Sequence, residues 1–327
     1  MLDKLVLVAS LAICLLATGC KKSADEKDPA ATDVATKVES ATEATPTEVE
    51  PAPETTTDDA EGSVNDAEDS AVVIKNPFFY TVTGPNGESG FLLGTMHMGV
   101  DAAKEMPKDV WLALASASSL TIEADITDVT VAMGLMLPKD QNLKDLLGEE
   151  SWALLEKKVG KPTAQMLLPM KPAAAASAIA IQGIKMTMPM DLAVVAKAQT
   201  AELPIHYLED AAFQLAMLEK VMTVETVREM LASEDATDMK TMLETYRKGD
   251  AEALLEEMQD TSSLGENGEE KIEALLFDRN ANWIPKLEEL FAEKGAFVAV
   301  GAAHLIGPRS VNALLKAKGY TITRMGE

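Results

Sequence analysis

The pattern of apolar and polar residues predicts β-strands near residue 80 and again near the end of the sequence. The first predicted strand covers residues 77–82 and the second covers residues 90–94, with Asn86-Gly87 between them. Asn-Gly between two apolar runs is a strong signal for a β-hairpin. Further strands are predicted over residues 119–125, 203–208, 296–300 and 320–324.

Helical periodicity fills most of the sequence between these strands. Apolar residues recur at helical spacing over residues 108–118, 283–294 and 310–318. From about residue 129 to residue 283 the pattern is almost entirely helical and is interrupted by prolines and by Gly249. Because strands alternate with helices, we expect an α/β fold with a mixed central sheet and a large helical insertion over about residues 129–283.

The amino-terminal segment has the pattern of a targeting signal. Lys4 precedes an apolar run of about a dozen residues, which is shorter than the ~20 residues that span a bilayer. Small residues, Ala17-Thr18-Gly19, stand directly before Cys20. We interpret residues 1–19 as a lipoprotein signal peptide and Cys20 as the lipidated first residue of the mature chain. One position departs from the usual bacterial lipobox pattern, because Ala17 stands where leucine is commonest. An uncleaved N-terminal anchor is the alternative.

The segment after Cys20 is predicted to be a disordered acidic tether. Residues 20–75 hold fifteen Asp/Glu and five Lys. Residues 21–70 have almost no aliphatic side chains, so they bury too little surface to offset the entropy of ordering. A single folded domain is expected over residues 76–327. Since the only other cysteine, Cys14, lies inside the signal peptide, this domain cannot form a disulfide.

Charge restricts the partners. The chain has a net charge of −24, and a negative field of this size opposes binding to phosphate backbones and to anionic lipid surfaces. We therefore expect no nucleic-acid partner and a membrane association that depends on the lipid at Cys20. The expected location is the cell envelope, with the chain lipid-anchored and facing the periplasm or the cell surface.

Two of the three histidines occupy the same local setting. Gly94-Thr95-Met96-His97 and Gly301-Ala302-Ala303-His304 each follow an apolar strand. Such a turn places a side chain at the carboxyl end of a strand, where open α/β sheets form their ligand crevice, and glycine permits close backbone approach. Two imidazoles with a carboxylate can bind Zn, Mn, Co or Fe and leave positions open for water. A single such turn more often holds a packed or hydrogen-bonded histidine, but two of them in a chain with three histidines favour a shared site. We therefore predict a divalent-metal site that activates water for hydrolysis.

These segments resemble the TraB/PrgY/GumN family, which also includes the Tiki membrane proteases and whose pattern has two Gly-x-x-His motifs with an acidic residue between them. The resemblance covers about residues 77–326. Its most specific parts are residues 92–99 and 300–307, and supporting matches occur at 122–125, 208–209 and 279–280. The resemblance implies an α/β fold with a helical insertion and, for some members, metal-dependent peptidase activity.

Two acidic residues are candidates for this site. Glu123 is predicted at the end of a strand, where it could complete the metal site or act as a general base toward the bound water. The other reading of Glu123 is an exposed carboxylate at a strand end. Glu209 follows the strand predicted over residues 203–208, and the resemblance places an acidic residue there; alternatively, its carboxylate is favoured by the dipole of the helix that follows.

A polar cluster at residues 278–283 supplies the remaining candidates. The Arg279 guanidinium could bind a substrate carboxylate or a developing oxyanion, or form an ordinary ion pair with Asp278 or Glu273. Asn280 is a secondary candidate, and we interpret the third histidine, His206, as structural.

Three hypotheses follow for the function. The leading one is a metal-dependent hydrolase of amide or ester bonds, acting on a peptide or a small molecule, with metal ligands His97, His304 and Glu123 and with Arg279 orienting the substrate. The second is a non-catalytic lipoprotein that binds a metal or peptide in the same crevice. The third is an envelope interaction protein whose helical insertion docks a partner.

Overall fold

A computed structural model describes residues 73–125, 127–232, 238–259 and 267–326. The signal peptide, the lipidation site Cys20 and nearly all of the acidic tether predicted above lie outside these residues. Within the described ranges, no helix is both long enough and apolar enough to cross a bilayer.

Six strands form one mixed sheet in the order β4-β3-β5-β2-β1-β6. Strands β2, β5, β3 and β4 are parallel, β1 is antiparallel to β2, and β6 is antiparallel to β1. This sheet confirms the predicted α/β fold. The strands are β1 (Phe79–Thr83), β2 (Ser89–Thr95), β3 (Ser119–Ile122), β4 (Ile205–Tyr207), β5 (Ala296–Gly301) and β6 (Thr321–Arg324).

The hairpin predicted around Asn86-Gly87 is confirmed. Strands β1 and β2 pair from Phe79 opposite Leu93 to Thr83 opposite Ser89, and Gly87 has a φ of 87°, a backbone conformation that glycine adopts without steric cost. The hairpin contributes to the core because the ring of Phe79 stacks on that of Phe297 in β5, with centroids 5.8 Å apart.

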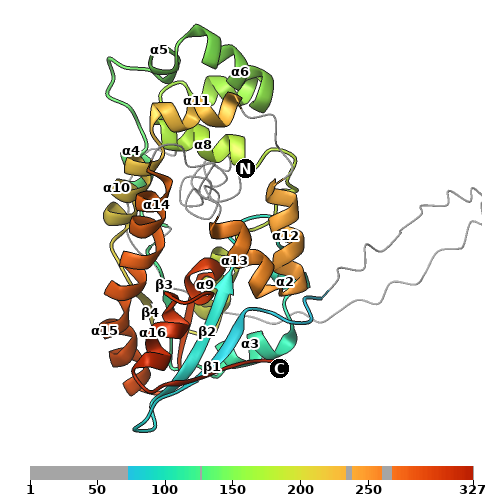
Figure 1. Ribbon diagram of the computed structural model, residues 1–327, viewed down its shortest axis with the longest axis vertical. Helices are drawn as coiled ribbons and strands as arrows, with labels where there is room; N and C mark the ends of the chain where they lie inside the picture. The colour runs from blue at the N-terminus through green and yellow to red at the C-terminus, as the bar shows by residue number, and fades with distance from the viewer. Residues whose placement is uncertain (1–72, 126, 233–237, 260–266, 327) are drawn as a thin grey trace, which may run out of the picture. The chain divides into compact units, whose positions relative to one another are not determined.

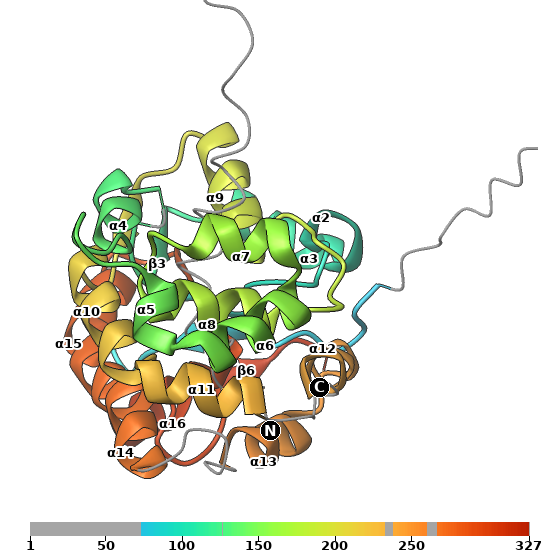
Figure 2. The same cartoon turned by 90° about the horizontal axis from the view of Figure 1, so that it is seen from above.

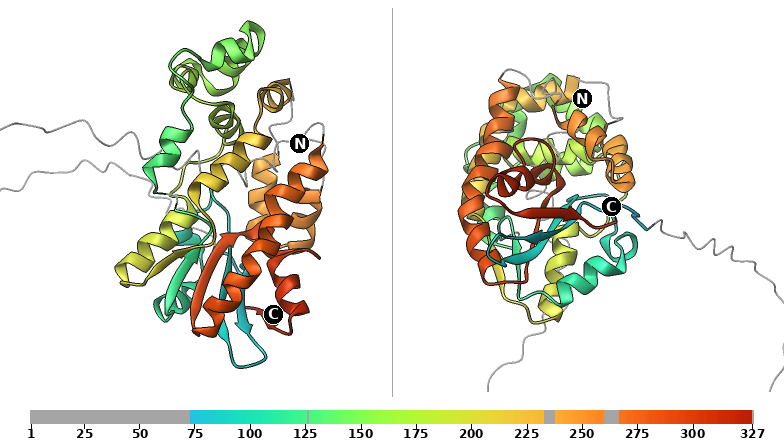
Figure 3. Two further views of the ribbon diagram at one scale, coloured as in Figure 1. Left: turned by 90° about the vertical axis from the view of Figure 1, so that its left-hand side faces the viewer. Right: turned by 60° about the horizontal axis from the view of Figure 1, so that its bottom comes forward.

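Helices cover both faces of the sheet. Helix α9 packs against β3 and β5, α15 against β2, and α16 against β6. Figure 3 shows α3 and α9 on one side of the sheet, with α16 on the other. The helices before residue 200 are α2 (Ala102–Glu105), α3 (Lys108–Ala115), α4 (Val129–Gly134), α5 (Leu143–Leu147), α6 (Glu149–Val159), α7 (Lys161–Leu167), α8 (Pro172–Ala180) and α9 (Met190–Thr200).

The later helices complete the insertion and return the chain to the sheet. They are α10 (Ala211–Val221), α11 (Val224–Ala232), α12 (Asp238–Lys248), α13 (Ala251–Gln259), α14 (Gly268–Ile272), the π-helix η2 (Glu273–Phe277), α15 (Asp278–Ala292), the 3₁₀ helix η3 (Ala302–Leu305) and α16 (Val311–Ala317). In Figure 1 the arrowhead of β2 points toward α5, α6, α8 and α11, and these helices lie over the centre of the fold when it is seen from above (Figure 2).

Three details differ from the sequence prediction. Strand β3 ends at Ile122, because the Asp125 carboxylate accepts hydrogen bonds from the backbone and side chain of Thr127 and turns the chain. Helix α15 begins five residues before the predicted start, at Asp278, as a continuation of η2. Strand β6 runs parallel to β5, as expected for a βαβ crossover, but β2 and β1 lie between them.

Candidate functional site

The two Gly-x-x-His turns leave neighbouring strands of the sheet. Strands β2 and β5 are parallel and paired, with Gly94 opposite Val300 and Thr95 opposite Gly301. Both turns therefore emerge at the same edge of the sheet, at the carboxyl ends of central strands. Gly94 is required here, because a Cβ on it would lie 2.9 Å from the Cα of Ala302 in the other turn.

His97, His304 and Glu123 converge on the position that a Cβ of Gly301 would occupy, which we call the space above Gly301. A Cβ built on Gly301 would lie 3.4 Å from Oε1 of Glu123, 3.6 Å from Nε2 of His97 and 3.6 Å from Cδ2 of His304. Three predicted site residues, from segments far apart in the sequence, thus surround a position that glycine leaves open.

Glu123 follows β3 directly and its carboxylate is held on both oxygens. Oε1 accepts a hydrogen bond of 2.8 Å from the backbone N–H of Gly301. Oε2 accepts from Nη2 of Arg279 at 2.6 Å and from Nε2 of Gln214 in α10 at 3.0 Å. Glu123 is therefore a fixed, largely buried carboxylate, in contrast to the exposed strand-end carboxylate of the alternative reading.

Arg279 lies between the two acidic candidates. Its guanidinium donates to Glu123 and, through Nε at 2.9 Å and Nη2 at 2.5 Å, to Oε1 of Glu209. Trp283 completes the group because its indole N–H donates to Oε2 of Glu209 at 3.1 Å. Arg279 is only 5% exposed, and its partners are these carboxylates instead of Asp278 or Glu273. It fixes the position of Glu123 directly.

Each site histidine is anchored through Nδ1. His97 Nδ1 lies 2.6 Å from Oδ2 of Asp191 in α9, and His304 Nδ1 lies 2.6 Å from Oδ1 of Asn280 in α15. Because a carboxylate and an amide oxygen only accept hydrogen bonds, both imidazoles donate through Nδ1. Nε2 is then the atom that each histidine directs toward the site.

The electrostatics give the two histidines different charges. Burial lowers the pKa of His97, but the adjacent Asp191 carboxylate outweighs burial and raises it to about 9. Burial lowers the pKa of His304 to about 3, and the nearby Arg279 cation acts in the same direction. Burial opposes the charged form of Glu123, yet Arg279 and the two histidines hold its pKa well below its usual range. Near neutral pH the site therefore contains cationic His97, neutral His304 and ionised Glu123.

The residues of the site fit a divalent cation in their chemistry. Within the described part of the chain, no group of three or more His, Cys, Asp or Glu side chains is already arranged to hold a metal ion. However, both imidazoles have the oxygen partner on Nδ1 that is typical of metal-binding histidines, and an ionised carboxylate lies beside them. Nε2 of His304 faces Nη1 of Arg279 at 3.3 Å, so a cation bound there would replace this contact.

Two residues that hold the site were not found from the sequence. Asp191 anchors His97 and Gln214 donates to Glu123; both lie in the helical insertion, where no local pattern distinguishes them from other polar helix residues. His206, by contrast, has an exposed side chain on the edge strand β4, away from the contacts described above.

Fold and site together define an α/β protein with a buried cluster of two histidines, two glutamates and one arginine at the carboxyl edge of a mixed sheet. The sequence profile of the TraB/PrgY/gumN family matches residues 78–324, and the chain belongs to this family. A search of curated proteins and a search of solved structures each found no match.

Proposed function

We propose that the protein is a hydrolase of amide or ester bonds that uses a divalent metal at the space above Gly301. One observation supports this most strongly: Glu123 Oε1 and His97 Nε2 lie 3.4 and 3.6 Å from the same empty Cβ position. His304 borders that position as well, at 3.6 Å.

His97 and His304 would hold the metal through Nε2, with Glu123 either completing the ligand set or acting as base. A bound metal lowers the pKa of its water from 15.7 toward about 7 and polarises a carbonyl oxygen. His304 is already neutral and able to donate its lone pair, whereas His97 must release a proton when a cation binds. Metal affinity is therefore expected to rise with pH.

Glu123 would either complete the ligand set or accept the proton of the attacking water. Its low pKa keeps the carboxylate ionised, and its bonds to Gly301 and Arg279 fix its direction. Arg279 is the residue we propose to orient the substrate; its Nη1 donates to the carbonyl oxygen of Leu275 and lies 3.3 Å from Nε2 of His304. The proposed substrate is a peptide or a small ester, and the proposed location is the cell envelope with a lipid at Cys20.

Metal analysis and hydrolysis assays on the full chain test this proposal. The wild type is loaded in turn with Zn²⁺, Mn²⁺, Co²⁺ and Fe²⁺ and assayed on a panel of fluorogenic peptides and esters. His97→Ala and His304→Ala should each lose bound metal and reduce kcat/KM at least 100-fold. His206→Ala is the matched control, because it removes the exposed histidine of β4, and it should behave as wild type. An inactive, metal-free wild type, or full activity in both site variants, overturns the proposal.

A further inference from the structure

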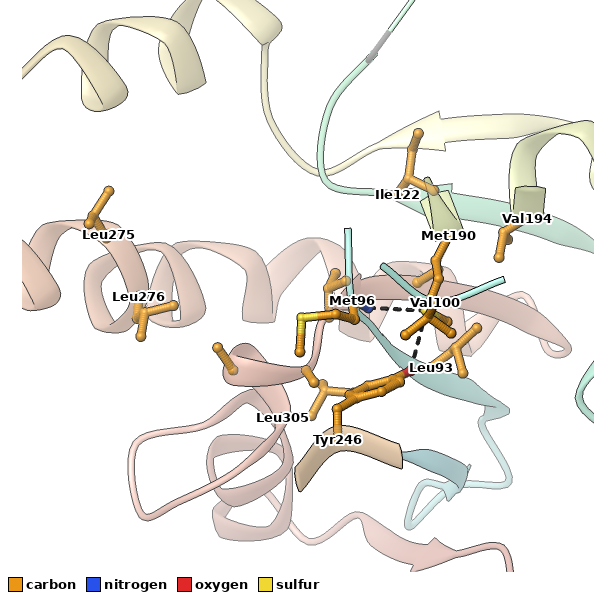
Figure 4. Close-up of a cluster of buried hydrophobic side chains, with 14 of the residues drawn as sticks. Leu93, Met96, Val100, Ile122, Met190, Val194, Tyr246, Leu275, Leu276 and Leu305 are labelled. Carbon is orange, nitrogen blue, oxygen red and sulfur yellow. Dashed lines mark hydrogen bonds between the residues drawn. The ribbon is translucent and has the colours of Figure 1, made fainter. Parts of the chain in front are cut away.

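The amino end of α9 binds the His97 turn through two consecutive side chains. Sδ of Met190 accepts a hydrogen bond from the backbone N–H of Met96 at 3.2 Å, a contact drawn in Figure 4. The next residue, Asp191, accepts from Oγ1 of Thr95 at 2.8 Å and from Nδ1 of His97 at 2.6 Å. Three successive residues of the turn are thus held by two successive residues of one helix.

Both carboxylate oxygens of Asp191 accept hydrogen bonds from the His97 turn. It is 6% exposed, and Oδ1 and Oδ2 are each used by a different residue of the turn. Its helix is fixed in turn, because α9 packs against β3 and β5 and its flanking residues Met190 and Val194 are buried in the core. The carboxylate therefore has a defined position relative to the sheet edge that carries the site.

We propose that Asp191 is a positioning residue that orients the His97 imidazole so that Nε2 faces the space above Gly301. A carboxylate at Nδ1 fixes both the ring plane and the tautomer of a histidine and increases the basicity of its other nitrogen. The use of this orientation for metal binding rests on the proposed function, whereas the orientation itself does not. The helical insertion would then contribute to the site directly, since it supplies this anchor.

The second histidine has an anchor of a different charge. Asn280 offers His304 a neutral oxygen, whereas Asp191 offers His97 an anion. Arg279 lies 3.3 Å from the imidazole of His304, and its cation there opposes a further proton on that ring. The two anchors thus differ in charge, and removing the charge at residue 191 changes the anchor of His97 while that of His304 stays in place.

Asp191→Asn is the variant that separates orientation from packing. It keeps the shape of the side chain but removes the charge, so that whichever way the amide turns, His97 and Thr95 have no carboxylate partner. Asp128→Asn is the matched control: Asp128 caps α4 in the same insertion by accepting from the backbone N–H of Thr130, and asparagine caps a helix about as well as aspartate.

Nitrogen-15 labelling of histidine in the full chain provides a readout that needs neither metal nor activity. The chain has three histidines, and His206→Ala and His304→Ala identify the signals of the other two. In the metal-free wild type we expect a downfield, exchange-protected Nδ1–H resonance for His97. Asp191→Asn should move it upfield or abolish it, because an amide oxygen is a weaker acceptor than a carboxylate, and Asp128→Asn should leave it unchanged. Absence of this resonance from the wild type, or an unchanged resonance in Asp191→Asn, overturns the proposal.

The second test measures Zn²⁺ affinity by competition with a chelator. Asp191→Asn should weaken binding about 10- to 100-fold, the usual effect of losing a residue that anchors a metal ligand, with the His304 signals unchanged. A variant that loses the His97 resonance yet binds Zn²⁺ as tightly as wild type contradicts the link to metal binding. If the wild type itself binds no Zn²⁺, the proposed function fails for this metal, while the resonance still decides whether Asp191 orients His97.

Discussion

Nη1 of Arg279 lies 3.3 Å from Nε2 of His304, so a permanent cation faces the lone pair of an imidazole in the middle of the site. Arg279 can occupy this position because Glu123 and Glu209 balance its charge. The contact helps keep His304 neutral, the form in which a histidine can accept a metal ion or a proton. The same guanidinium therefore orders the carboxylates and sets the charge of the imidazole.

Replacing Arg279 should destabilise the fold as well as the site. Arg279→Ala leaves two buried carboxylates without their common partner, and breaking a buried ion pair in this way costs about 3–5 kcal/mol. Arg279→Lys should recover only part of this loss, because an ammonium cannot reproduce the forked contacts with both glutamates. Urea denaturation measures both effects.

Arg309→Ala is the control for that experiment. Arg309 pairs with Glu273 at the surface, where both side chains are largely exposed, so its removal should change the urea midpoint little. Equal destabilisation by Arg279→Ala and Arg309→Ala would contradict the prediction that the buried ion pairs of Arg279 contribute more to stability than the exposed pair of Arg309.

The two motif glycines should respond to alanine in opposite ways. Gly94→Ala places a Cβ 2.8 Å from the Cβ of Phe78 and 2.9 Å from the Cα of Ala302, an overlap that costs typically 1–3 kcal/mol. Gly301→Ala meets only contacts of 3.4 Å or more and has a φ of −50°, which alanine adopts readily. It should fold with nearly wild-type stability and lose metal binding, because the methyl group fills the space among Glu123, His97 and His304.

Thermal melting and metal titration of both glycine variants check this contrast. The prediction is wrong if Gly301→Ala binds metal with wild-type affinity, or if it melts at a lower temperature than Gly94→Ala.

The stability of the metal-free protein should fall at alkaline pH because of His97. Its folded-state pKa is about 9, against 6.5 for an ordinary histidine. The folded state therefore binds the proton more tightly, and this stabilisation is complete below pH 6.5 and is lost as the pH rises to about 9. His97→Gln should flatten the decline in urea midpoint between pH 6.5 and 9, whereas His206→Gln should not. A wild-type midpoint that stays constant over this range would contradict the raised pKa.

Tyr246 in α12 also holds the first turn. Its hydroxyl donates to the carbonyl oxygen of Gly94 at 2.8 Å and lies 3.5 Å from Sδ of Met190. Tyr246→Phe leaves a buried carbonyl with one partner fewer, and we expect a loss of about 1–3 kcal/mol. Tyr320→Phe is the comparison, since no hydrogen bond of its hydroxyl is found within the described residues; a similar loss there would assign the effect to tyrosine removal in general.

The sequence predicted the parts of the site that depend on local patterns. Short continuous apolar runs located β2 and β5, and glycine and histidine recur after both runs. The structure places the two turns at the ends of neighbouring strands, where Gly94 lies opposite Val300. Family resemblance added Glu209 and the Arg279-Asn280 pair, all of which the structure brings to the same cluster. Their chemical roles remain predictions.

The anchors could not be predicted, because their roles arise from tertiary packing. Asp191 occupies the first turn of α9, where an acidic residue is favoured by the helix dipole in any protein. Gln214 is one polar residue among several on α10. Only the position of each helix against the sheet, set by apolar contacts over the whole insertion, distinguishes them from solvated side chains. The position of β6 next to β1 could not be predicted for the same reason, because the spacing of strands along the sequence does not determine their order in the sheet.

The pairing of β2 with β5 also determines when the protein can acquire its site. Gly94 and Val300 are partners in the sheet, yet 205 residues lie between them in the sequence. Contacts of such long sequence separation require closure of a large loop before they contribute stability, which slows folding. A growing or truncated chain that lacks β5 also lacks His304, the backbone N–H that holds Glu123 and the central partner of β2. A chain that has not yet reached β5 therefore lacks a complete site, and any chemistry that needs both histidines begins only once β5 has joined the sheet.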